Sequence, residues 1–213
     1  MKRGSPQRRN LSMRIANKVT AYFIDRKIIA TEKRNIFEYG FELIFADSIN
    51  FAIILLTSAW FHALDVGLVY LLCFVSTRIF CGGFHADTHI MCGISMFAMF
   101  CCFMAVYHAL NITQTYIIFS GLVIAWIPII GYAPVIHENK PLSRQYRKRN
   151  RRKALVICGI WTLISVVFIL SGIQLGVAIA VTIWIVSIGI ICGKAKSAWK
   201  EGKDGEWSEF DSV

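Results

Sequence analysis

The stretch that decides the fold runs from residue 154 to residue 192 and reads ALVICGIWTLISVVFILSGIQLGVAIAVTIWIVSIGIIC. It contains no charged residue, and a short connection at residues 171–174 separates its two apolar halves. A helix needs roughly 20 mostly apolar residues to cross the roughly 30 Å hydrocarbon core of a bilayer. Each half comes close to that length, so the stretch is predicted to form two membrane-spanning helices.

The rest of the chain repeats this pattern, which predicts an all-α, polytopic membrane helical bundle. Of the 213 residues, 56% are hydrophobic and only 17% are charged, whereas soluble proteins carry about 25% charged residues. The net charge of +10 would suit a nucleic-acid partner, but the apolar excess argues against one. We expect about six spanning helices, some of which could be re-entrant, at residues 41–60, 66–80, 92–110, 115–136, 154–170 and 175–192.

The basic residues orient the bundle in the membrane. Every Lys and Arg lies in residues 2–34, at Arg78, in residues 140–153 or in the tail from Lys194. The three short connections between spans contain none, and their shortness predicts antiparallel hairpins. Since basic residues accumulate on the cytoplasmic side, we expect a multi-pass protein of the cell membrane with both termini and residues 81–92 in the cytoplasm.

Three regions are expected along the chain. Apolar side chains recur at helical spacing near the N-terminus, which predicts a basic amphipathic helix on the anionic membrane surface; they are Leu11, Ile15, Val19, Tyr22 and Phe23. The regions are a basic N-terminal segment (1–35), a transmembrane domain that would carry any catalytic site (36–193) and an acidic cytoplasmic tail (194–213).

A second basic cluster follows the fourth span. Its members considered for binding are Lys140, Arg144, Arg147 and Lys148. Such a cluster beside a span is predicted to bind the head groups of membrane lipids. Lipid binding is the favoured interpretation, and the same cluster could also receive an acidic peptide.

Polar residues are concentrated between the second and third spans, at residues 78–92, which read RIFCGGFHADTHIMC. Ionisable groups at membrane depth are costly and usually functional. One hypothesis is a metal site made by Cys81, His85, His89 and Cys92. On one straight helix the outer two would lie about 16 Å apart, whereas zinc needs its ligands about 2.0–2.3 Å from one point. Only a broken helix or ligands from two subunits would build such a site, so we expect no metal.

The second hypothesis is a nucleophilic thiolate at Cys92. This residue opens a span, and a helix N-terminus lowers the pKa of a thiol. A histidine within about 3 Å would complete a thiolate–imidazolium pair. His89 lies one helical turn away, whereas His85 would lie roughly 10 Å away on a continuous helix, so spacing alone slightly favours His89. For His85 to act, the chain must bend, and Gly82 and Gly83 supply a break.

Three motifs, in order, resemble a known family. They are Tyr39-Gly40-x-Glu42, Arg78…Gly82-Gly83-x-His85-Ala86…Cys92 and Ala133-Pro134…Asn139-Lys140-Pro141-Leu142. This pattern, over residues 36–153, resembles the accessory gene regulator B family, the membrane endopeptidases of Gram-positive peptide quorum sensing. The resemblance implies that His85 and Cys92 form the catalytic pair and requires a bend after Gly83. The residues it places in supporting roles are Arg78, Gly82, Gly83 and Glu42.

The resemblance also implies a substrate and a reaction. The substrate would be an AgrD-like propeptide with an amphipathic leader, a central segment bearing a Cys or Ser, and an acidic tail. Cys92 would cleave before the tail through an acyl-enzyme thioester, and the propeptide's own nucleophile would then close a thiolactone or lactone ring. No cofactor is expected, and the expected partners are the propeptide, membrane lipids and a second copy in a homodimer.

Two other functions and one assignment stay open. Six spans with polar groups also fit a transporter, although paired broken helices are not evident. The Cys/His cluster also fits a membrane protein that binds a metal without catalysis. A third group often orients the histidine of a cysteine protease; the candidates, any of which could instead be structural, are Asp87, Glu42, Asp47 and Asn50.

Overall fold

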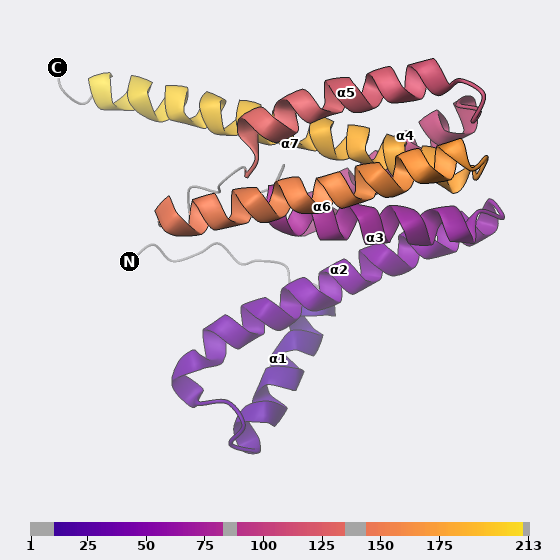
Figure 1. Cartoon of the computed structure of the whole chain (residues 1–213). Helices are drawn as coiled ribbons and strands as arrows, with labels where there is room; N and C mark the ends of the chain where they lie inside the picture. Colours follow the sequence, from indigo (N-terminus) through magenta and orange to yellow (C-terminus); the bar gives the residue numbers. More distant parts are fainter. Residues whose placement is uncertain (1–10, 83–88, 135–143, 211–213) are drawn as a thin grey trace.

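The computed structural model describes residues 11–82, 89–134 and 144–210, with side chains described over residues 15–82, 91–134 and 148–199. Within these ranges the chain forms seven α-helices and one short 3-10 helix (Figure 1). They are α1 (Leu11–Asp25), η1 (Thr31–Lys33), α2 (Arg34–Trp60), α3 (Leu64–Cys81), α4 (His89–Ala109), α5 (Thr115–Tyr132), α6 (Arg144–Leu170) and α7 (Leu175–Phe210). Helices α2 to α7 are long and apolar enough to cross a membrane, which confirms an all-helical, multi-pass membrane protein with six spans.

Helix α7 forms the centre of the bundle. In its most apolar stretch 72% of the residues are buried, against 11–44% for the other five spans. It packs against α3, α4, α5 and α6. A helix that is apolar on all sides is suited to such a central position, because every face meets another helix or lipid.

Small residues let α6 and α7 approach closely. A methyl group on Gly176 would lie 2.8 Å from the Ser165 carbonyl oxygen and 2.8 Å from the Ile169 backbone nitrogen. The Ser165 hydroxyl donates a hydrogen bond to the Gly176 carbonyl at 2.7 Å. Close backbone approach at small residues and hydrogen bonds between helices are the usual means of association in lipid, where no hydrophobic effect drives it.

The prediction that every short connection makes a packed hairpin is only partly right. Helices α2 and α3 pack against each other, and so do α6 and α7. Helix α5 instead packs mainly against α7, and α4 packs against both α2 and α7. The physical reason is that α7 offers both of them an apolar surface, so the turn between α4 and α5 need not pack the two helices against each other.

Helix α1 confirms that the N-terminal periodicity is helical. It packs along α2, with Ala16 and Thr20 buried and the Phe23 and Phe41 rings stacked at 5.8 Å. The pair α1 and the first half of α2 lies apart from the other helices (Figure 1). The larger apolar residues Ile15 and Tyr22 stay exposed, and contact of this surface with the membrane stays a prediction.

The helices differ from the predicted spans at their ends, most of all in α2, α5, α6 and α7. Helices α2 and α6 begin earlier and include basic residues, and α7 continues past the expected domain boundary at 194 as far as Phe210. Helix α5 ends at Tyr132 rather than at 136, because Ala133 precedes a proline and adopts an extended conformation with ψ 138°. The helices thus extend beyond the apolar segments from which they were predicted, except where the sequence ends the helix, as at Ala133.

Alternating helices bring the polar segments to one end of the bundle. Helices α3 and α5 end, and α4 and α6 begin, at the same end, and the three short connections lie at the other (Figure 1). This end therefore carries the residues on both sides of the Cys/His cluster and the basic start of α6.

Candidate active site

The cluster at residues 78–92 is divided between two helices. Helix α3 ends at Cys81, and Gly82 follows with φ 70° while its N–H donates to the Arg78 carbonyl at 3.0 Å. A positive φ of this kind favours glycine, which explains the residue type at this helix end. Helix α4 begins at His89, so the ends of the cluster do not belong to one straight helix.

The histidine of the predicted pair lies outside the described residues. His85, Gly83 and the expected bend after Gly83 all fall in residues 83–88, and Asp87 falls there too. The side chain of His89 is likewise outside the description. Which histidine meets Cys92 therefore stays a prediction.

Cys92 lies in the first turn of α4 and is half-buried. Its carbonyl accepts a hydrogen bond of 2.9 Å from the Ser95 hydroxyl. The first turn of a helix carries a partial positive charge from the backbone dipoles, which stabilises negative charge that develops beside it during a reaction. Cys92 thus combines partial access with an environment suited to a nucleophile.

Asn50 of α2 is the polar side chain that lies against the start of α4. A methyl group on Gly93 would come within 2.8 Å of Asn50 Oδ1 and 3.3 Å of Asn50 Nδ2. Of the other candidates for a third group, Glu42 is buried in α2 with 8% of its surface exposed, and Asp47 is exposed. Spacing along the sequence left Asn50 among several candidates and gave no sign of its contact with Gly93.

The end of α3 is fixed to α6. Cys81 is buried, and its Sγ lies 3.5 Å from the Sγ of Cys158. One turn earlier, the Trp161 indole N–H donates to the Ser76 hydroxyl at 2.8 Å. The Cys81 thiol therefore faces a thiol of α6, which the metal hypothesis did not include.

Arg78 lies in the last turn of α3 and is half-buried. Its guanidinium carbon is 5.4 Å from the centroid of the Phe74 ring, within cation–π range. The contact keeps the guanidinium beside its own helix. This places a cation near the end of α3, immediately before the Gly-Gly segment.

The basic start of α6 lies at the same end. Lys148 is exposed, the Arg151 guanidinium donates to the Ile130 carbonyl at 2.9 Å, and Lys153 Nζ lies 5.4 Å from the Phe80 ring centroid. Arg144 and Arg147 belong to α6, but their side chains, like the whole of Lys140, are outside the description. The described contacts tie the basic helix to the ends of α5 and α3.

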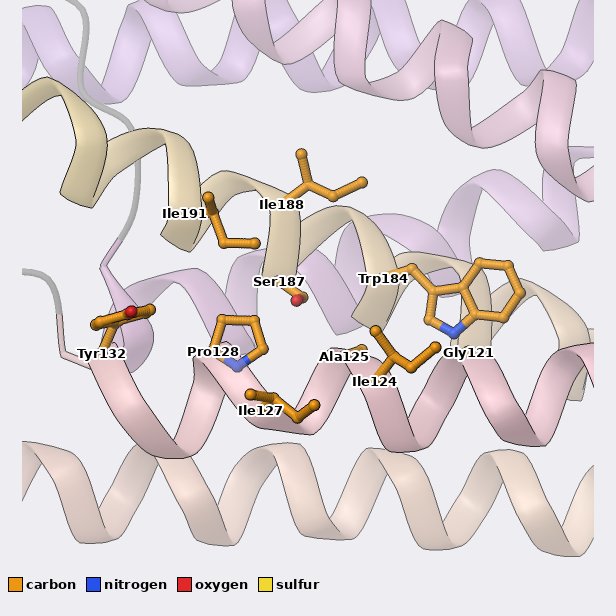
Figure 2. Close-up of a pocket in the computed structure, with 10 residues that line it drawn as sticks. All are labelled: Gly121, Ile124, Ala125, Ile127, Pro128, Tyr132, Trp184, Ser187, Ile188 and Ile191. Atoms are coloured by element: carbon orange, nitrogen blue, oxygen red, sulfur yellow. The ribbon is translucent and has the colours of Figure 1, made fainter.

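A separate apolar groove runs between α5 and α7, with a volume of about 580 Å³ (Figure 2). Its ten lining residues include no cysteine, histidine or charged side chain. The Trp184 indole nitrogen on its wall is buried and has no hydrogen-bond partner among the residues described. The groove suits an apolar chain, and the polar side chains in its lining are those of Tyr132, Trp184 and Ser187.

Comparison with known proteins gives one match. The sequence model of the accessory gene regulator B family matches residues 15–191. Searches of curated proteins and of solved structures found no match. The matched range includes α2 to α6 and the first part of α7, residues 175–191, together with all residues of the Cys/His cluster.

Proposed function

The chain belongs to the accessory gene regulator B family, a peptidase family that processes precursors of autoinducing peptides in quorum sensing, and from this premise we propose that it is a cysteine endopeptidase with Cys92 as nucleophile. The substrate is an AgrD-like propeptide. The observation that carries the proposal is the position of Cys92 in the first turn of α4. There the thiol is partly accessible, whereas Cys81, Cys73 and Cys158 are fully buried.

The first half of the reaction releases the tail of the propeptide. His85 accepts the Cys92 thiol proton, and the thiolate attacks the carbonyl carbon of the peptide bond before the tail. The tetrahedral oxyanion collapses, the C–N bond breaks, and the new amine takes the proton held by His85. The leader and central segment remain bound to Cys92 as a thioester.

The second half closes the ring. The propeptide's own Cys or Ser attacks the thioester carbonyl, its proton passes to His85, and the Cys92 thiolate leaves and is reprotonated. The product is a thiolactone or a lactone still attached to the leader. Exclusion of water by the membrane boundary favours this exchange over hydrolysis of the thioester.

Charge supports the orientation and the binding of substrate. The end of the bundle with Cys92 also carries the basic start of α6. Basic residues that flank membrane spans accumulate on the cytoplasmic side. Both termini and the active site are therefore cytoplasmic, in the membrane of a Gram-positive bacterium. The basic cluster that follows α5 attracts the acidic tail of the propeptide or lipid head groups. Its members are Lys140, Arg144, Arg147 and Lys148. We also propose that two copies of the chain form a homodimer.

The proposal is tested by co-expression with a propeptide tagged at its tail. Wild type should release the tag, and Cys92→Ala and His85→Gln should not. Cys101→Ala is the matched control, since Cys101 lies on the same helix with an exposed side chain and should cleave normally. Continued cleavage by Cys92→Ala would overturn the proposal, and loss of cleavage on chelation together with inactive Cys81→Ala would favour metal chemistry.

A further inference from the structure

Asn50 touches the part of α4 that carries the nucleophile. Its carboxamide occupies the space beside Gly93 where any other residue would place a β-carbon, at 2.8 Å for Oδ1 and 3.3 Å for Nδ2. Gly93 directly follows Cys92, and consecutive α-carbons are about 3.8 Å apart, so the amide lies beside the turn of α4 that carries the nucleophile. The pair of helices α2 and α4 is packed together, which holds this amide in place.

The carboxamide has capacity to bind a further group. Asn50 is half-buried, and within the ranges that the structure describes no other residue hydrogen-bonds its side chain. An asparagine amide has two N–H donors and one acceptor oxygen. A rotation of the amide by 180° exchanges Oδ1 and Nδ2, so either a donor or the acceptor can face the site.

We propose that the Asn50 side-chain N–H donates a hydrogen bond to the oxyanion formed when Cys92 attacks the propeptide. This inference rests on the proposed function and adds a catalytic residue to it. Rotation about the Cys92 side chain and the new C–S bond allows the oxygen of an acyl carbon on Sγ to turn toward a donor beside the neighbouring residue. Both tetrahedral intermediates, in tail release and in ring closure, place their negative oxygen on that same carbon and use the same donor.

The donor role agrees with the energetics of acyl transfer. A fixed hydrogen-bond donor aimed at a developing oxyanion stabilises the transition state without reorganisation, and loss of one such donor lowers kcat about 10²–10³-fold. The α4 N-terminus adds a partial positive charge to the same region. Glycine at position 93 is then required because a methyl group would displace the amide.

The competing role for Asn50 is to accept a hydrogen bond from the catalytic histidine and orient it, as a third group does in other cysteine proteases. The two roles use different atoms. Orientation needs the acceptor Oδ1, which aspartate retains, whereas oxyanion binding needs the donor Nδ2, which aspartate lacks. Asn50→Asp therefore separates them at nearly constant shape.

The experiment uses the full chain in lipid nanodiscs with a synthetic propeptide and measures tail release by steady-state kinetics. Asn50→Asp and Asn50→Leu should each lower kcat about 10²–10³-fold and leave KM within about threefold. Ser48→Ala is the control, because it removes a polar group from an exposed position of the same helix, and it should match wild type. The rate of Cys92 alkylation by iodoacetamide should be unchanged in all variants, because alkylation forms no oxyanion.

A double-mutant cycle tests the contact itself. Gly93→Ala alone should lower kcat as Asn50→Ala does, because its methyl group pushes the amide away. In the Asn50→Ala background the same Gly93→Ala change should cost less than about threefold, because the space is then empty. This cycle also decides the matter if Asn50→Leu or Asn50→Asp fails to fold.

Several outcomes would overturn the inference. They are an Asn50→Asp enzyme within about threefold of wild type, Asn50 variants whose Cys92 alkylation slows in parallel with cleavage, or additive effects of Gly93→Ala and Asn50→Ala. Failure of the proposed function is recognised separately, since Cys92→Ala would then still release the tail.

Discussion

A buried tyrosine at the centre of the bundle gives a sharp test of its packing. Tyr70 of α3 is fully buried, and its ring centroid lies 5.3 Å from Phe74, 5.3 Å from Phe100 and 4.5 Å from Phe103. Phe100 and Phe103 belong to α4, so this aromatic cluster joins the helix of Arg78 to the helix of Cys92. The Tyr70 hydroxyl is buried without a hydrogen-bond partner among the described residues.

The perturbation is Tyr70→Phe, which removes the hydroxyl and keeps the ring. A buried donor left unsatisfied costs about 1–3 kcal/mol, so its removal should raise the free energy of unfolding by about 1 kcal/mol at least. For a chain of this size that corresponds to a rise in Tm of roughly 2–4 °C. Tyr70→Ala removes the ring as well and should lower the free energy of unfolding by about 3–5 kcal/mol.

The assay is thermal unfolding of the purified protein in one detergent at one scan rate, because membrane proteins often unfold irreversibly. Tyr116→Phe is the matched control, since Tyr116 is 92% exposed, and its Tm should not change. A clear fall in Tm for Tyr70→Phe, absent in Tyr116→Phe, would refute the reasoning, because it would show that the hydroxyl has a stabilising partner.

Three further predictions concern thiols and close contacts. Mild oxidation should join Cys81 to Cys158 in a disulfide, because their sulfurs lie 3.5 Å apart. Peptide mapping should detect this disulfide, and Cys158→Ser should abolish it. A disulfide from Cys81 to Cys92 instead would refute this packing. Cys92 should react with iodoacetamide faster than the exposed cysteines of α4, because the proposed reaction makes it the nucleophile of the site; equal rates would show that it is not activated. Gly121→Ala should lower the free energy of unfolding by about 1–3 kcal/mol, since its methyl group would overlap the indole ring of Trp184. Gly131→Ala is the control and should leave the free energy of unfolding unchanged, because the space around Gly131 is open. Equal effects of the two substitutions would contradict the close contact.

Much of the fold could be predicted from the sequence because the membrane imposes it. Bilayer thickness fixes the length of each apolar segment, and the predicted spans agree with α2 to α7 apart from their ends. Helix periodicity does not tell which helix packs on which. For this reason the contact of α4 and α5 with α7, rather than with each other, could not be foreseen.

The candidate site was predictable only in part. The motif from Arg78 to Cys92 predicted a site that stays untested, whereas the position of Cys92 at the start of α4 agrees with its expected place at the start of a span. The contact between Asn50 and Gly93 joins residues far apart in the chain, and no local spacing encodes such a contact. The pairing of Cys81 with Cys158 was missed for the same reason.

The central claim is that Cys92 forms a thioester with the propeptide, and trapping that thioester tests it most directly. A propeptide whose own Cys or Ser is replaced by Ala cannot close the ring, so the acyl-enzyme should accumulate. Intact-protein mass spectrometry should then find the leader and central segment attached to wild type at Cys92, released by hydroxylamine and absent from Cys92→Ala. Release of the tail with no adduct at Cys92, or with the adduct on another cysteine, would contradict the account.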